Sequence, residues 1–217
     1  MATRGSMAEK APSVSSEHEE KLGRLLTVAA EIFAEKGYHH ASIRDLSRRA
    51  GVSLSGLYYY FSSKEELLFM IQDRSLRNVL AELDVKLRGI DSPEEKLRVL
   101  VRNHVGFFAH NMAAMRVLTH EYDSLEGEYR TKIRNLRLRY SNLCTEILRD
   151  VRRFSGGGDI VPLNVATFGL FGMMNWIYAW YRPGSSVSVD RLADHLYRLF
   201  VSGFIGRSGT PAAKRAG

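Results

Sequence analysis

The sequence predicts an all-α protein, with a three-helix domain at the N-terminus, a larger helical bundle after it and about nine helices in all. Three observations support this prediction. Apolar residues recur at helical spacing in one segment after another. Residues that typically cap helices stand at the ends of these segments. No segment alternates apolar and polar residues as a half-buried strand does.

The first three predicted helices are short and closely spaced. Gly37 ends the first helix, as glycine commonly does at a C-terminus. Ser42 caps a second helix that ends near Ala50, and Ser53 caps a third helix that continues through Tyr60. The apolar face of the first helix comprises Leu22, Leu25, Leu26, Ala29 and Phe33.

Six further helices are predicted after these three. Ser63, with Glu66 three residues later, starts the fourth helix, which runs to about residue 88 and joins the two parts. Ser92 followed by Pro93 starts the fifth helix, which runs to about residue 109. The others are predicted over residues 112–118, 125–154, 162–181 and 189–205. A glycine-rich loop over residues 155–159 and the turn Arg182–Gly184 separate the last three.

These elements divide the chain into two domains, over residues 17–62 and 63–206. The flanking segments 1–16 and 207–217 are expected to be disordered. The N-terminal residues lack the apolar core of a secretory signal. The most apolar stretch, residues 164–181, is shorter than a helix that spans a bilayer, which needs about 20 apolar residues. We expect it to be a helix buried on most sides, with no membrane partner.

Composition favours a cytoplasmic protein with a polyanionic partner. Apolar residues make up 45% of the chain, which is enough for a sizeable core. The net charge is +7 and the pI about 9.6, so nucleic acid is a candidate partner. The single cysteine, Cys144, cannot form an internal disulfide and is too little for a zinc site.

Residues 42–60 show the order helix, tight glycine turn, helix, which is the helix-turn-helix pattern. Leu46 and Leu57 are predicted to form its small core against the first helix. The start of the second helix of such a unit enters the DNA major groove, where short side chains let the backbone approach the bases. Between Lys36 and Lys64 the chain has five basic residues and one acid. The short or flat side chains at the helix start are Ser53, Leu54, Ser55 and Gly56.

Four aromatic residues follow in a row from Tyr58 to Phe61. Successive helical positions point about 100° apart, so the four rings cannot all face one core. Tyrosine hydroxyls can instead donate to DNA phosphates, and Lys64 adds a charge at the next helix start. Core packing is the alternative, chiefly for Tyr58 and Phe61.

The segment AEIFAEKGYHHASIRDLSRRAGVSLSGLYYYFSSKEELL, residues 30–68, resembles the DNA-binding domain of the TetR/AcrR family of bacterial repressors. The resemblance rests on G-Y, S-I-R-D-L, A-G-V-S, L-Y-x-Y-F and S-K-E-E-L-L in register. It implies a repressor that binds a palindromic double-stranded DNA operator. Leu54–Gly56 stands where the family often has Lys-Gly-Thr, so no operator sequence is implied. The resemblance places Ser42 and Arg44 near the DNA backbone, Ser53, Leu54, Ser55 and Tyr59 in the major groove, and Tyr58, Tyr60 and Lys64 at phosphates.

Residues 175–203 resemble the last two helices of TetR-type regulators of fatty-acid and related acyl-CoA catabolism, including W-Y-R-P-G at 180–184. The resemblance implies a homodimer, an acyl-CoA effector and no cofactor. A dimer is also favoured by the apolar character of both helices, in which Gly169 and Gly172 permit close approach. Packing of both helices within one chain is the alternative. The candidate dimer residues are Phe168, Gly172, Leu192, Leu196, Leu199 and Phe200.

Apolar and adaptable side chains on several helices predict an effector pocket. Residues 130–153 carry eight basic residues and two acids, so arginines there could meet the phosphates of a coenzyme A thioester. A solvated basic face is the alternative. The candidate ligand residues are Phe107, Phe108, Met112, Met115, Phe171, Met174, Trp176 and Arg182, and most are also compatible with simple core packing.

Other classes of function have weaker support. His39 and His40 are adjacent, and His104 and His120 could converge, but no metal-binding spacing is present and no metal is expected. No nucleophile elbow or phosphate loop predicts an enzyme. Two alternatives stay open: a TetR-type regulator of efflux or stress genes that responds to an apolar or aromatic ligand, and a helical ligand-binding protein or enzyme with an incidental basic patch.

Overall fold

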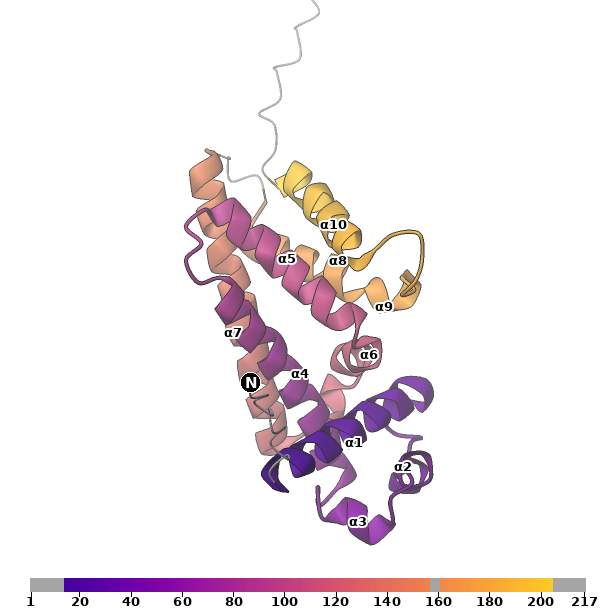
Figure 1. The fold of residues 1–217 in the computed structure, drawn as a ribbon. Helices are drawn as coiled ribbons and strands as arrows, with labels where there is room; N and C mark the ends of the chain where they lie inside the picture. Colours follow the sequence, from indigo (N-terminus) through magenta and orange to yellow (C-terminus); the bar gives the residue numbers. More distant parts are fainter. Residues whose placement is uncertain (1–13, 157–160, 205–217) are drawn as a thin grey trace, which may run out of the picture.

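The computed structural model describes residues 14–156 and 161–204, which fold into ten α-helices and one 3₁₀ turn, with no strand in these ranges. The predicted all-α fold is therefore confirmed (Figure 1). One end of the molecule holds α1 (Val14–Lys36), α2 (Ile43–Ala50) and α3 (Leu54–Tyr58). The larger bundle comprises α4 (Lys64–Lys86), α5 (Pro93–Ala109), α6 (Met112–His120), the 3₁₀ turn η1 (Tyr122–Ser124), α7 (Gly127–Ser155), α8 (Leu163–Asn175), α9 (Ile177–Trp180) and α10 (Val189–Phe204).

Three expectations concern residues outside the described ranges. These are the disorder expected over 207–217, most of the disorder expected over 1–16, and most of the predicted loop over residues 155–159. Helix α1 already begins at Val14, which is earlier than the expected start of the first domain at residue 17.

Helices α4 and α7 pack against each other along the length of the molecule and connect its two ends (Figure 1). Helices α1, α2 and α3 lie at one end, and α5, α8 and α10 lie at the other. Helix α6 lies between them and packs against α1, α4, α5 and α9. Any displacement of α6 therefore acts on both ends at once.

The predicted caps of the first domain form. Ser42 accepts from the N–H of Asp45 while its own N–H donates to the Asp45 carboxylate, a complete capping box. Gly51 ends α2 in the left-handed region, at φ 65°. Ser53 accepts from the N–H of Gly56 at the start of α3. Ser63 caps α4, as predicted. The Glu66 carboxylate accepts from the N–H of Ser62 rather than that of Ser63, so the two residues do not form a complete capping box.

Helix α3 is shorter than predicted. It ends at Tyr58 because the N–H groups of Tyr60 and Phe61 both bond to the carbonyl of Leu57, which closes a turn. This turn directs Phe61 into the core, where it is buried. For Phe61 the alternative of core packing is thereby confirmed.

The single helix predicted over residues 162–181 is broken in two. Helix α8 ends at Asn175, the N–H of Trp176 donates to the Gly172 carbonyl, and α9 turns to pack against α6. The expected burial on most sides is also wrong for the described chain, because Val165 and Phe168 are exposed. None of the helices in the described ranges is long and apolar enough to cross a membrane.

The hydrophobic core is continuous through both ends of the molecule. Leu46 and Leu57 are buried against α1, as predicted, together with Leu25 and Phe33. Cys144 on α7 is fully buried, and this burial raises the pKa of its thiol to about 12.

Leu57→Ala is expected to lower the free energy of unfolding by about 2–5 kcal/mol, because Leu57 is 0% exposed and its truncation would leave a cavity in the core. Leu54→Ala on the same helix is the matched control. Leu54 is 39% exposed, so its loss should change stability by about 0.5 kcal/mol or less. Guanidinium unfolding at one protein concentration measures both variants. Equal losses would show that Leu57 does not anchor α3.

Candidate functional site

The N-terminal half of α3 presents a surface of short and flat side chains. Ser53, Leu54 and Ser55 are exposed, and the two serine hydroxyls lie 3.2 Å apart. Tyr59 is the most open of the aromatic residues, with 74% of its surface exposed, and Tyr58 is also exposed. The core alternative for Tyr58 is therefore wrong in the single chain. All five of these residues, each predicted to contact DNA, are therefore open to solvent.

Two predicted contact residues have structural partners within the first domain. A Cβ at Gly56 would lie 3.1 Å from Cγ1 of Val52, so glycine here permits the close turn between α2 and α3. The ring of Tyr60 is half-buried and stacks on His18 of α1, with 4.8 Å between ring centroids. Tyr60 therefore ties α3 to α1 and offers less surface than its neighbour Tyr59.

The ammonium of Lys64 is already in contact with groups of the first domain, which the sequence does not indicate. Its ammonium donates to the carbonyl of His39 at 3.2 Å and lies 4.5 Å from the ring centroid of Tyr38. Burial there lowers the pKa of Lys64 from its ordinary value. Arg44, in contrast, is exposed on α2 and has no ion-pair partner within residues 14–156 and 161–204.

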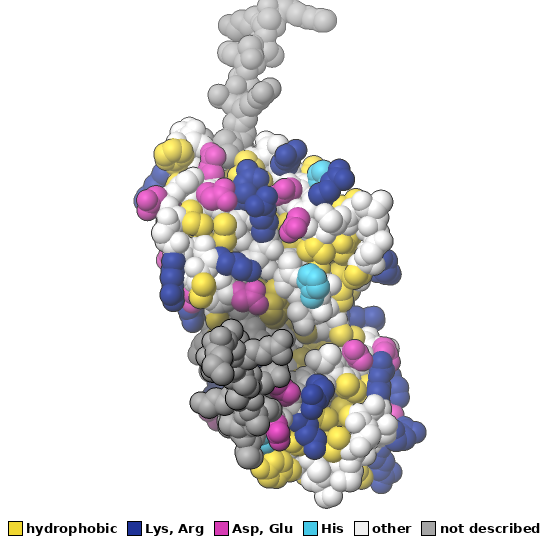
Figure 2. Space-filling view, viewed as in Figure 1, with side chains coloured by type: hydrophobic (Ala, Val, Ile, Leu, Met, Phe, Trp, Pro, Cys, Tyr) yellow, Lys and Arg dark blue, Asp and Glu magenta, His cyan; other side chains and the backbone are white. Residues whose placement is uncertain are grey.

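The positive charge of this end is partly neutralised. Lys36 and Arg48 both pair with Asp45, at 2.9 and 2.6 Å, and the Lys36 ammonium and the Ser42 cap hold the pKa of Asp45 well below its usual range. Arg49 pairs with Glu31 and Glu35 of α1. Both acids lie outside the window from Lys36 to Lys64, so the sequence count overstated the local charge. Figure 2 shows Lys and Arg side chains gathered at the end that holds α2.

A pocket of about 280 Å³ opens in the larger bundle, between α5, α6, α7 and α8. Its walls are mainly apolar. The lining residues are Leu76, His104, Phe108, Met115, Leu118, Thr119, Tyr122, Arg134, Arg137, Leu138, Tyr140, Ser141, Phe168, Phe171 and Asn175. We call this cavity the effector pocket.

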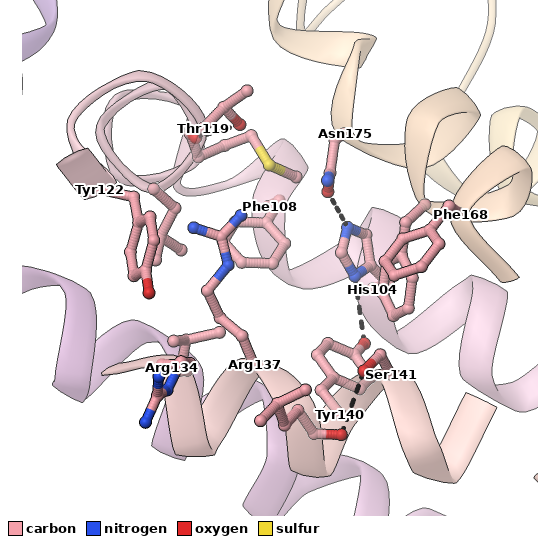
Figure 3. A pocket seen from close by; sticks show the side chains of 15 residues that line it. His104, Phe108, Thr119, Tyr122, Arg134, Arg137, Tyr140, Ser141, Phe168 and Asn175 are labelled. Carbon is pink, nitrogen blue, oxygen red and sulfur yellow. Dashed lines mark hydrogen bonds between the residues drawn. The ribbon is translucent and has the colours of Figure 1, made fainter. Parts of the chain in front are cut away.

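Two arginines of α7 lie at one side of the effector pocket. The guanidinium of Arg137 lies 4.6 Å from the ring centroid of Tyr122, and Figure 3 shows it extending past Phe108 toward Thr119. Arg134 is exposed one turn earlier on the same helix. Neither side chain forms an ion pair within the described ranges, whereas Arg130 pairs with Asp123 at 2.9 Å and Arg139 with Asp84 at 2.6 Å.

The predicted ligand residues divide into three groups. Phe108, Met115 and Phe171 line the effector pocket. Phe107 and Met112 line a second cavity, of about 370 Å³, between α1, α4, α5 and α6. Met174, Trp176 and Arg182 line neither: Met174 is in the core, Trp176 is turned to the surface by the break after α8, and Arg182 bonds to the carbonyl of Tyr181. The structure therefore places these three residues outside both cavities.

Sequence reasoning missed the polar wall of the effector pocket. His104, Tyr140 and Asn175 are far apart in the chain, and His104 was considered only as a metal ligand. Histidine and asparagine within apolar helical segments are the signal that could have found them, because buried polar groups need partners.

The histidines do not converge. His120 contacts the hydroxyl of Tyr178 at 2.6 Å, while His104 bonds to Tyr140 and Asn175. No group of three or more His, Cys, Asp or Glu that could hold a metal occurs in the part of the chain that the structure describes.

Some of the predicted dimer residues are exposed, and others are buried within the single chain. Phe168 and Leu199 are 67% and 68% exposed, and Gly172 is exposed beside Phe168 on α8. Leu192 and Leu196 are buried within the single chain, because α10 packs on α5, so they are core residues. Phe200 stacks on Phe204 within α10. The unpartnered apolar surface of α8 and α10, which we call the α8–α10 face, comprises Val165, Phe168, Gly169, Gly172, Trp176 and Leu199.

The segment from α6 to α7 is hydrogen-bonded both to the first domain and to α4. The Glu121 carboxylate accepts from the N–H of Tyr38 at 3.0 Å, in the loop between α1 and α2. The Glu121 carbonyl accepts from Nε2 of the buried Gln72 at 3.3 Å. The N–H of Glu126 donates to the carboxylate of Glu65 at the start of α4. Glu121 precedes Tyr122, which lines the effector pocket.

Comparisons with known proteins cover both ends of the chain. The family described as "Bacterial regulatory proteins, tetR family" matches residues 25–71, and "Tetracyclin repressor-like, C-terminal domain" matches residues 90–204. The chain is similar to the fatty acid metabolism regulator protein of Bacillus subtilis (strain 168). The two are 24% identical over 186 residues, which are 84% of this chain and 95% of that protein.

Two solved structures share the fold. The TetR family transcriptional regulator PfmR from Thermus thermophilus is 31% identical, with a TM-score of 0.72 over 82% of this chain and 96% of that one. AibR, solved in complex with isovaleryl coenzyme A and operator DNA, is 24% identical, with a TM-score of 0.73 over 82% and 97% of the chains. Since a family match spans more than half of the residues, the chain belongs to the TetR family of bacterial transcriptional regulators.

Proposed function

We propose that the protein is a dimeric repressor that leaves a palindromic DNA operator when a coenzyme A thioester with a short acyl group enters the effector pocket. The observation that carries this proposal is the pairing of apolar walls with two arginines, Arg134 and Arg137, that lack an acidic partner within the described ranges. A regulator of this kind acts on DNA in the cytoplasm and needs no cofactor or catalytic group.

DNA recognition is assigned to the exposed surface of α3. Ser53, Leu54, Ser55 and Tyr59 would reach base edges in the major groove, because the start of the second helix lies deepest there. Tyr58 and Arg44 would contact phosphates from the groove walls. Tyr60, Gly56 and Lys64 would act mainly by holding α3 and the loop before α2 in place, since each has a partner within the domain.

Dimerisation is assigned to the α8–α10 face. A monomer seldom exposes several large apolar side chains on two helices that are in contact, and an isologous dimer would bury each face against its copy. Gly169 and Gly172 have open space at their Cβ positions, which allows the two α8 helices to approach closely. Such a dimer would present its two α3 helices to successive major grooves, about 34 Å apart.

The effector is assigned by the chemistry of the effector pocket. Apolar walls suit an acyl chain. The volume of about 280 Å³ lies just below the usual range for small-molecule sites, so the acyl chain is short. The phosphates of coenzyme A would lie against Arg134 and Arg137, which are exposed beside the opening. The fatty acid metabolism regulator of Bacillus subtilis and the isovaleryl coenzyme A complex of AibR support this choice of ligand class.

Coupling between pocket and DNA is assigned to the segment Glu121–Tyr122. Phosphates that draw Arg137 away from the ring of Tyr122 would shift η1. The shift would loosen the bond between Glu121 and the backbone of Tyr38, which fixes the loop between α1 and α2. The two states would then differ in the position of α3, so effector and operator would each weaken the binding of the other by the same factor.

Isovaleryl-CoA is expected to release the protein from an operator duplex selected from random-sequence DNA, and isovaleric acid is expected to bind at least about tenfold more weakly. Each charge-assisted hydrogen bond to phosphate contributes about 1.5–3 kcal/mol, and the free acid makes none. Calorimetric titration and fluorescence anisotropy measure binding and release.

Arg137→Gln should weaken binding of the thioester but not of the acid. Arg139→Gln is the control, because Arg139 is on the same helix and is paired with Asp84. If the free acid binds as tightly as the thioester, the effector assignment is wrong and the assignment of DNA recognition to α3 is unaffected.

Tyr59→Ala is expected to weaken operator binding by about 1–3 kcal/mol without changing stability, since Tyr59 is exposed and contacts in such interfaces are worth this much. Anisotropy titration of the selected duplex gives the affinity. Val85→Ala, which changes an exposed apolar residue of α4 outside this surface, should leave the affinity unchanged. Normal operator affinity of the Tyr59 variant would remove this residue from the DNA-binding surface.

Glu121→Ala is expected to reduce the factor by which isovaleryl-CoA weakens operator binding toward one, while the pocket still binds the thioester. Couplings of this kind are commonly about 5- to 150-fold. The factor is obtained from operator titrations with and without ligand. Glu128→Ala is the control, because Glu128 is an exposed carboxylate of α7 that pairs only with Lys132 in the described structure. An unchanged factor would place the coupling elsewhere.

A further inference from the structure

Three polar side chains from three helices meet at the wall of the effector pocket. Nδ1 of His104 lies 3.1 Å from the hydroxyl of Tyr140, and Nε2 lies 3.1 Å from Oδ1 of Asn175. Figure 3 shows the imidazole of His104 between the other two groups. The proposed assignments of acyl chain and phosphates leave this cluster without a role.

The donors and acceptors of the cluster can be assigned in only one way. Oδ1 of Asn175 can only accept, so Nε2 of His104 carries the proton, and Nδ1 accepts from the Tyr140 hydroxyl. Burial lowers the pKa of His104 to about 3, so the imidazole is neutral at physiological pH. Both of its nitrogens are occupied, and His104 has no donor left for a ligand.

The amide nitrogen of Asn175 is the free donor of the cluster. It has no protein partner among residues 14–156 and 161–204, and Asn175 is a half-buried lining residue of the pocket. The neighbouring walls are hydrocarbon, from Phe108, Met115 and Phe171. A ligand without a hydrogen-bond acceptor at this point would bury the amide unpaired, which disfavours its binding.

We propose that the side-chain amide of Asn175 donates a hydrogen bond to the carbonyl oxygen of the effector's thioester, and that His104 and Tyr140 position this amide. The inference rests on the proposed coenzyme A thioester effector. The thioester carbonyl is the acceptor that joins the hydrocarbon part of such a ligand to the rest of the molecule. A donor inside an apolar pocket, beyond the arginines, is complementary to it.

The test compares isovaleryl-CoA with its thioether analogue, S-(3-methylbutyl)-CoA, in which CH₂ replaces the carbonyl. Calorimetric titration of the full-length protein gives both dissociation constants. The unsubstituted protein should bind the thioester about tenfold more tightly, which is the effect of one buried hydrogen bond. In Asn175→Leu the two constants should become equal, mainly because the thioester is bound more weakly.

Thr119→Val is the matched control. Thr119 also lines the pocket, but its hydroxyl donates to the carbonyl of Met115 within α6, so its removal should leave the preference for the thioester intact. Tyr140→Phe is the second variant, in case Asn175→Leu does not fold by circular dichroism. It keeps the ring, removes the donor to His104, and should reduce the preference.

Each outcome supports or overturns the inference. Equal binding of thioester and thioether by the unsubstituted protein overturns it and leaves the acyl-CoA effector standing. A preference that survives in Asn175→Leu, or in Tyr140→Phe where that variant is the one that folds, also overturns it. If the unsubstituted protein binds neither ligand, the proposed effector and the inference fail together.

Discussion

The position of the DNA-binding helices depends on one constraint: α1, α2 and α3 alone form too small a domain to bury enough apolar surface to be stable. Leu46 and Leu57 cover one side of α1, but its other side needs α4 and α6. The larger bundle therefore supplies part of the core of the smaller domain. As a result α3 has no orientation of its own that is independent of the bundle, and a change in the bundle can alter how α3 is presented.

The same segment of chain serves the effector pocket and this shared core. Leu118, Thr119 and Tyr122 line the pocket, and Glu121, placed among them, holds the loop that leads into α2. No long pathway of side chains is needed between the two sites, because Tyr122 lines the pocket and its neighbour Glu121 bonds to the loop before α2. In the proposed coupling, a two-state shift of this one segment would make binding at one site disfavour binding at the other.

Local features of the fold could be predicted from the sequence, and features made by distant residues could not. The caps at Ser42, Gly51 and Ser53 depend on neighbouring residues, so their pattern predicts them. The break after Asn175 has no glycine or proline to mark it and depends on packing of α9 against α6. The pairing of Arg49 with Glu31 and Glu35 likewise depends on how α2 lies on α1. The polar wall of the pocket joins positions 104, 140 and 175, whose proximity only the tertiary fold creates.

The burial of Cys144 has a consequence for the measurement of motion in this protein. Thiol reagents attack the thiolate, and this sulfur, the only one of its kind in the chain, is both enclosed and held protonated. Alkylation can therefore proceed only during moments when the bundle opens around α7. The rate of alkylation of this sulfur therefore reports how often the bundle opens. A ligand that binds the closed form lowers the population of the open form and slows the alkylation of Cys144.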